Sequence, residues 1–169
     1  MKKKHKYYLR RPLYLNANLL YSEALNYIKK QHWKRAIKTG TLKKLKENGF
    51  KLVTSILTRM EVMQRLSLEE NQTITQARKI YFEIVDKYNI KEITAIHRYI
   101  VLHDDFIETI ARSNLDFKDA FHLQIAKNTD IPLCTHDKKL RKNYSNHEAK
   151  SKFYEAVFKP EDLIRPKKR

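Results

Sequence analysis

Short apolar runs alternate along this chain with longer segments in which apolar residues recur at the spacing of an α-helix. The runs cover residues 12–15, 50–55, 90–93, 132–135 and 154–158, and each has the length of one β-strand. Alternation of this kind is typical of a parallel sheet with helices on both faces. The sequence therefore predicts an α/β fold, Rossmann-like, with three α/β/α layers around a parallel sheet of four to five strands.

The segments with helical spacing cover residues 19–38, 43–47, 56–66, 75–88, 95–113 and 117–128. Thr41 is the expected cap of the second segment and Asn48-Gly49 its expected end, while Asp116 stands at the start of the last one. In a parallel sheet the functional crevice lies beyond the carboxyl ends of the strands. The residues that directly follow the apolar runs are therefore the candidates for a site.

The organisation of the chain is simple. A length of 169 residues fits one domain, and basic ends predict an arm over residues 1–11, a domain over residues 12–158 and a tail over residues 159–169. No apolar run is long enough to span a membrane, and no apolar stretch follows the basic start as in a secretory signal. The single cysteine, Cys134, excludes an internal disulfide and is expected to be a small buried side chain. We expect a cytoplasmic protein.

The chain is strongly basic, with 36 Lys and Arg against 19 Asp and Glu and a formal net charge of +17. Such an excess favours a polyanionic partner, because bound phosphates release condensed counterions, although a merely basic surface is the alternative. Trp33, beside Lys34 and Arg35, is the best candidate for stacking on a base. Further candidate nucleic-acid contacts are Lys138, Lys139 and Arg141. Other aromatic residues among basic ones are Tyr7, Tyr8, Tyr14, Phe50, Tyr99 and Tyr144.

Glycine is nearly absent, since only Gly40 and Gly49 occur. A phosphate-binding P-loop, a dinucleotide-binding GxGxxG turn and a GxSxG nucleophile elbow all require more glycines at fixed spacing. Any catalytic chemistry must therefore come from side chains.

Polar and acidic side chains follow the predicted strands. Asn16 and Asn18 come after the first run, and Glu61 lies near the start of the helix after the second. Asp119 begins the helix before the run at 132–135, and Thr135 and Asp137 end that run. Carboxylates gathered at one edge repel each other, and a bound cation resolves that conflict. Oxygen ligands suit Mg²⁺ or Mn²⁺, whose bound water can attack a phosphodiester.

Four motifs in this order resemble those of PIN domains. They are Leu15-Asn16-Ala17-Asn18-Leu19-Leu20, Thr54-Ser55 through Glu61-Val62, Asp119-Ala120-Phe121-His122-Leu123 with Ala126, and Cys134-Thr135-His136-Asp137. The resemblance covers roughly residues 12–158. It implies a single-strand RNA endonuclease that uses Mg²⁺ or Mn²⁺, in a family that includes VapC-like toxins and ribosomal RNA maturation enzymes. It also admits an antitoxin protein or a second copy of the chain as a partner.

By this resemblance, Glu61, Asp119 and Asp137 are the metal-site carboxylates. Thr135, Ser55, Asn18 and His122 support them. The chain departs from the family at Asn16, where the pattern has an Asp, so the site loses one negative charge and its metal affinity should fall. Asn16 marks either an inactivated variant or a natural member that binds RNA without cutting it well. We expect Asn16→Asp to create or raise Mn²⁺-dependent activity.

Each candidate also has a structural interpretation. Asp119 suits a helix dipole, Asp137 could cap the turn after it, and Asn18 could cap the helix that starts at Leu19. Glu61 could be a solvated charge, and His122 a histidine with a satisfied ring nitrogen instead of a phosphate ligand.

Two other functions compete with the endonuclease. One is a non-catalytic RNA-binding or ribonucleoprotein assembly module on the same fold. The other is a phosphohydrolase of HD type, suggested by His103-Asp104, which would require an all-helical fold.

Overall fold

A central parallel sheet organises the molecule. The computed structural model describes residues 11–28, 40–100, 115–146 and 157–164. In this part of the chain, a 5-stranded sheet has the order β3-β2-β1-β4-β5, and all of its pairings are parallel. The strands are β1 (Pro12–Leu15), β2 (Lys51–Ser55), β3 (Lys91–Ile93), β4 (Leu133–Cys134) and β5 (Val157–Phe158). The predicted fold class is confirmed, and the all-helical phosphohydrolase interpretation is wrong.

Helices connect the strands. They are α1 (Ala17–Tyr27), α2 (Thr41–Glu47), α3 (Ile56–Glu70), α4 (Ile74–Lys87), the short 3₁₀ helix η2 (Ile96–Arg98), α6 (Phe117–Thr129), α7 (Lys138–Asn146) and α8 (Pro160–Leu163). Each corresponds to a predicted helical segment except α7, where only a turn was expected, and α8. The helix predicted over residues 95–113 appears as η2 at its start, and residues 101–114 lie outside the described part.

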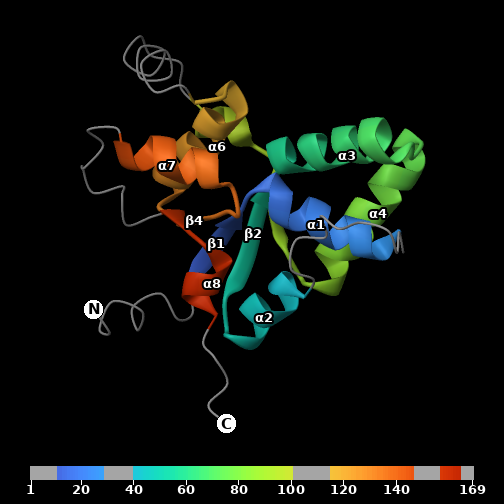
Figure 1. The fold of residues 1–169 in the computed structure, drawn as a ribbon, viewed down its shortest axis with the longest axis horizontal. Helices are drawn as coiled ribbons and strands as arrows, with labels where there is room; N and C mark the ends of the chain where they lie inside the picture. The colour runs from blue at the N-terminus through green and yellow to red at the C-terminus, as the bar shows by residue number, and fades with distance from the viewer. Residues whose placement is uncertain (1–10, 29–39, 101–114, 147–156, 165–169) are drawn as a thin grey trace.

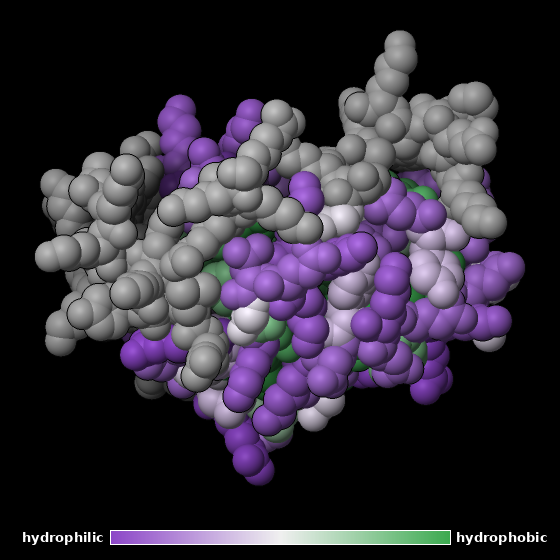
Figure 2. Space-filling view, turned by 90° about the horizontal axis from the view of Figure 1, so that it is seen from below, coloured by the Kyte–Doolittle hydropathy of each residue, from purple (hydrophilic) through white to green (hydrophobic). Residues whose placement is uncertain are grey.

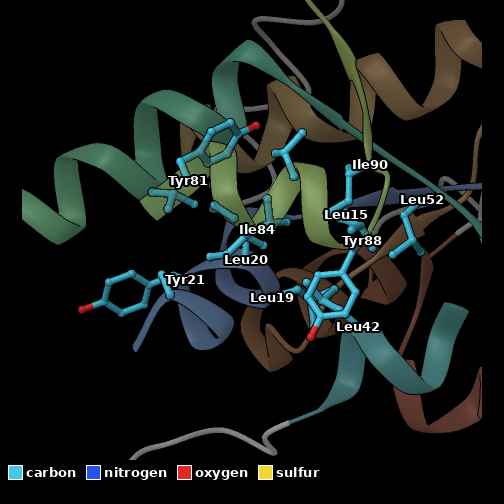
Figure 3. Packing of buried hydrophobic residues seen from close by; sticks show 14 of the residues in the cluster. Leu15, Leu19, Leu20, Tyr21, Leu42, Leu52, Tyr81, Ile84, Tyr88 and Ile90 are labelled. Carbon is cyan, nitrogen blue, oxygen red and sulfur yellow. The ribbon is translucent and has the colours of Figure 1, made fainter. Parts of the chain in front are cut away.

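The alternation of side chains along β1 divides the core into two. Leu13 and Leu15 point to a cluster formed with α1, α2, α3 and α4, shown in Figure 3. Tyr14 points the opposite way, into a cluster with Leu133 and with Ile125 of α6. Figure 1 shows α6 and α7 on one side of the strands and α1 and α4 on the other. These are the predicted three layers.

The helix ends follow from capping chemistry. Ser55 ends β2 and caps α3, since its Oγ accepts from the backbone N–H of Thr58. Asp116 caps α6 as expected, accepting from the N–H of Lys118 at 2.8 Å. Asn48-Gly49 ends α2 as expected, and Gly49 has a φ of 86°, which glycine tolerates best. Gly40, with a φ of 79°, is the N-cap of α2, so the prediction of Thr41 was wrong by one residue.

The strand order reverses beside β1. The chain runs from β1 to β2 and β3 on one side, then returns to place β4 and β5 on the other side. Such a reversal opens a crevice beyond the carboxyl ends of the two central strands. Asn16 follows β1 and Thr135 follows β4, so both lie at this point.

A short helix, α8, lies within residues 159–169, the range predicted as a tail. Pro160 and Leu163 of α8 are buried, and α8 packs against α2. Figure 2 shows that the described side chains on the lower face are mostly hydrophilic. Among the described helices, none has the length and apolar character needed to cross a membrane.

Candidate active site

Hydrogen bonds join the segments that follow β1 and β4. The backbone N–H of Asn16 donates to the carbonyl of Cys134 at 3.1 Å. The Asn18 amide donates from Nδ2 to Oγ1 of Thr135 at 3.0 Å, and its Oδ1 accepts from the N–H of His136 at 3.4 Å. Asn18 therefore connects the first turn of α1 to the segment that follows β4. It does not cap α1.

Asn16 is the cap of α1. Its Oδ1 accepts from the backbone N–H of Asn18 at 3.1 Å, and the residue is 5% exposed. The helix begins at Ala17, two residues earlier than predicted, because Asn16 leaves β1 with extended dihedrals that suit a capping residue. The position thus has a structural role that an aspartate would fill equally well.

Thr135 and Asp137 form a second local unit. Thr135 is fully buried, and its Oγ1 accepts from the N–H of Asp137 at 3.0 Å. Oδ1 of Asp137 accepts from the N–H of Leu140 at 2.9 Å and so caps α7. Thr135 therefore supports Asp137, and the capping interpretation of Asp137 is also correct. The two roles are compatible, because a carboxylate has a second oxygen.

The pKa of Asp119 reflects the other acidic residues near it. Burial and the neighbouring carboxylates of Asp137, Asp116 and Glu61 raise the pKa of Asp119 from 3.8 to about 6, while His122 opposes this shift. Burial is the main cause of this shift, and the nearby negative charges add to it. Glu61 and Asp137 therefore lie close enough to act on Asp119, although the three residues come from α3, α6 and the segment before α7.

Glu61 is held by a buried histidine. Nε2 of His122 lies 2.8 Å from Oε1 of Glu61, and Nδ1 lies 2.7 Å from the hydroxyl of Tyr14. His122 is fully buried, so the expectation that it could bind phosphate is wrong, whereas a supporting hydrogen bond is present. The Tyr14 hydroxyl also lies 2.7 Å from Oγ of Ser55. Burial raises the pKa of Tyr14, which keeps its proton.

Tyr14 was not predicted to be a member of the site. It was grouped with the aromatic residues considered for stacking on bases. Tyr14 is fully buried and Phe50 is 5% exposed, so neither can contact a base. A signal was available, because alternation along residues 12–15 places Tyr14 on the sheet face opposite Leu13 and Leu15. Tyr7, Tyr8 and the side chain of Tyr144 lie outside the described part.

The acidic residues suit a hard cation in chemistry and charge. Carboxylate oxygens are ligands that Mg²⁺ and Mn²⁺ prefer, and neighbouring carboxylates add to the burial that raises the pKa of Asp119. Within the described ranges, no three histidine, cysteine or acidic side chains are close enough to form a ready-made metal cage. Magnesium needs no such cage, since it binds through one or two carboxylates and keeps several waters.

Basic residues flank the acidic group on α7. Lys138 and Lys139 are exposed on its first turn, directly after Asp137, while Arg141 donates from Nε to the Asp137 carbonyl at 3.1 Å. The two lysines are therefore available to a polyanion, and Arg141 stabilises the loop. Trp33, Lys34 and Arg35 lie outside the described residues, so their predicted contact with nucleic acid stays a prediction. Cys134 is fully buried, as expected.

A family model described as PIN domain matches residues 23–146, well over half of the chain. The matched stretch includes Glu61, Asp119 and Asp137 and begins after Asn16. The comparison with curated proteins gives no match.

Two solved structures are similar to the chain. The crystal structure of PAE2754 from Pyrobaculum aerophilum has a TM-score of 0.54 and 20% sequence identity, over 92% of this chain and 88% of that one. The structure of VapBC-1 from nontypeable Haemophilus influenzae has a TM-score of 0.49 and 14% identity, over 80% of this chain and 93% of that one. At such identities the first likeness concerns the fold alone, and the second is too low to carry an argument.

Proposed function

The chain belongs to the PIN domain family, a family of nuclease type, and from this premise we propose that it is a divalent-metal-dependent endonuclease of single-stranded RNA. The observation that carries the proposal is the convergence of acidic side chains from α3, α6 and the segment before α7: burial, and then the carboxylates of Asp137, Asp116 and Glu61, raise the pKa of Asp119 to about 6. Acidic groups crowded in this way are costly to the metal-free fold and are expected where a cation binds.

Glu61, Asp119 and Asp137 would hold Mg²⁺ or Mn²⁺, with the oxygen of Asn16 as a weak neutral neighbour. The metal supplies an activated water and neutralises charge on the phosphate. The chain's own residues position the carboxylates. Thr135 orients Asp137 through its backbone, Asn18 fixes Thr135, and Ser55 starts the helix that bears Glu61.

The positive charge of the chain supports an RNA substrate. A net charge of +17 attracts a polyanion, and the exposed Lys138 and Lys139 directly follow Asp137, where they are available to the phosphates of a bound RNA. An antitoxin or a second copy of the chain as partner, the cytoplasmic location, and the division into arm, domain and tail stay predictions.

The test is cleavage of several unstructured, end-labelled RNAs by the full chain with Mn²⁺ or Mg²⁺, with a chelator as the blank. We expect slow cleavage that Glu61→Gln or Asp119→Asn abolishes. Glu47→Gln on α2 is the matched control, because Glu47 forms only a surface pair with Lys43 at 3.9 Å. Equal cleavage by Glu61→Gln and the native chain would contradict the proposal, since it would trace the activity to another nuclease.

A second function, RNA binding without cleavage, is favoured by one observation. Asn16 stands where the family pattern has an aspartate, so the site lacks one negative charge. A Mn²⁺ titration separates the two functions. A nuclease site loses Mn²⁺ binding in Glu61→Gln and Asp119→Asn, whereas a binding module retains RNA equally well with the metal removed.

A further inference from the structure

A buried chain of polar side chains leads from the sheet to Glu61. Ser55 Oγ lies 2.7 Å from the Tyr14 hydroxyl, which lies 2.7 Å from Nδ1 of His122. Nε2 of His122 then lies 2.8 Å from Oε1 of Glu61. Ser55, Tyr14 and His122 are each 0% exposed, and only the Glu61 side chain, at 16%, reaches solvent. The four residues come from β1, β2, α3 and α6, so the sheet and two helices converge on one carboxylate.

The proton positions in this chain follow from what each group can donate. An ionised carboxylate only accepts hydrogen bonds, so Nε2 of His122 must carry a proton that it donates to Glu61. With a neutral ring, Tyr14 donates to Nδ1 and Ser55 donates to Tyr14. With a charged ring, Nδ1 donates to Tyr14 and Tyr14 donates to Ser55. Both arrangements give each of the three contacts one donor and one acceptor, and both direct the Nε2–H of His122 at Glu61.

We infer that Tyr14 and His122 are positioning residues for the nuclease proposed above, because they fix the orientation of the Glu61 carboxylate. The inference rests on the proposed function. Oε1 of Glu61 is committed to the histidine, which leaves Oε2 to the cation. The ring itself is 0% exposed, so it would act through Glu61 and not directly on a substrate. Partners that orient a metal-binding group in this way change metal affinity about 10- to 100-fold when they are removed.

The decisive variant is Tyr14→Phe in the full chain. It removes one hydroxyl and leaves Nδ1 of His122 without its partner, so the ring and Glu61 lose their fixed orientation. We expect Mn²⁺ affinity to fall about tenfold. The affinity is measured from the electron paramagnetic resonance signal of unbound Mn²⁺. In RNA cleavage, kcat should fall while KM stays close to native, because the proposed RNA contacts on α7 are untouched.

Tyr81→Phe is the matched control. Tyr81 is also 0% exposed, and its hydroxyl donates to Glu92 at 2.7 Å in the other core cluster. Each variant loses one tyrosine hydroxyl from the core: the hydroxyl of Tyr14 bonds to His122 and Ser55, and that of Tyr81 bonds to Glu92. A merely structural role therefore predicts a loss of stability in both variants and no difference between them in Mn²⁺ affinity. We expect Tyr81→Phe to keep native Mn²⁺ affinity. Equal affinities in Tyr14→Phe and the native chain would overturn the inference.

The imidazole ¹⁵N spectrum tests the arrangement without metal. We expect His122, assigned by its loss in His122→Gln, to carry a proton on Nε2 and to respond to Glu61→Gln. A ring protonated on Nδ1 alone, or one indifferent to Glu61→Gln, would overturn the inference. If the expected spectrum appears but neither the native chain nor Asn16→Asp binds Mn²⁺, the nuclease function fails while the fixed orientation of Glu61 stands.

Discussion

Leu140 donates its backbone N–H to Oδ1 of Asp137 over 2.9 Å, so a carboxylate proposed to hold a cation also caps α7. Two substitutions distinguish the capping role from the metal-binding role. Asp137→Asn keeps an oxygen for the cap and loses the charge, whereas Asp137→Ala loses both. We expect Asp137→Asn to fold with nearly native stability and to lose Mn²⁺-dependent cleavage. Asp137→Ala should lose a further ~1 kcal/mol in urea unfolding, as measured for lost caps. Full cleavage by Asp137→Asn would remove Asp137 from the metal site.

Asn16→Asp restores the carboxylate that the family pattern has at this position. Asparagine and aspartate cap helices about equally well, so α1 should form normally. The added charge should raise Mn²⁺ affinity and create or increase RNA cleavage. The measurement is a Mn²⁺ titration followed by a cleavage time course on several RNAs. Asn16→Ala is the control, because it removes the cap without adding charge. No gain in either assay would count against a metal at this position.

The hydroxyl of Thr135 connects the first turn of α1 to the segment that leads into α7. It is fully buried and accepts from Nδ2 of Asn18 and from the N–H of Asp137, each at 3.0 Å. Thr135→Val keeps the shape and leaves both donors without this acceptor. We expect a loss of about 1–3 kcal/mol in the free energy of unfolding, together with reduced cleavage. Thr135→Ser retains the oxygen and should stay close to native. Equal free energies of unfolding for Thr135→Val and Thr135→Ser would show that the hydroxyl does not stabilise the fold.

Asp119 should make the stability of the metal-free chain depend on pH. Its pKa is about 6 in the folded chain against an ordinary value of 3.8, so between these values the folded chain binds more protons than the unfolded chain. The free energy of unfolding should therefore fall as the pH rises through this window. Thermal unfolding with a chelator present measures it. Asp119→Asn should flatten the curve, and an unchanged curve would mean that other groups cause the dependence.

Lys138 and Lys139 should contribute to RNA affinity through charge alone. Replacing both by Ala should weaken binding to all single-stranded RNAs similarly and reduce the slope of log affinity against log salt by up to ~1.4, at about 0.7 per lost phosphate contact. Fluorescence anisotropy over a range of salt concentrations measures both effects. The matched control replaces Lys43 and Lys44, an exposed pair on α2, away from α6 and α7 (Figure 1). An equal loss in the control would indicate non-specific charge.

Most elements of this fold could be predicted from local sequence. The strand expected over residues 12–15 is β1, Pro12–Leu15, and the helix expected after Asp116 is α6, Phe117–Thr129. Spacing of apolar residues and capping chemistry act within a few residues, so a single sequence contains them. The candidate acidic residues were chosen because they follow strands or begin helices and because they match the family motifs, and their role in a metal site stays a prediction.

Where local signals compete, the boundaries shifted. Asn16 and Asn18 are both good capping residues, and only the end of β1 decides that Asn16 takes this role. Likewise, the N-cap of α2 is Gly40 and not Thr41. The φ of 79° at this position is one that glycine adopts more readily than other residues. Propensity alone could not choose between such neighbours.

By itself, the sequence determined the kinds of element and their order, and it supplied the candidate acidic residues. Only the tertiary structure decided the strand order and the connection of Tyr14 to Ser55 and His122, which lie 41 and 108 residues further along the chain. The physical reason is that hydrogen bonds in a buried site depend on which elements pack together. That packing follows from the burial of whole faces, which a local pattern does not contain.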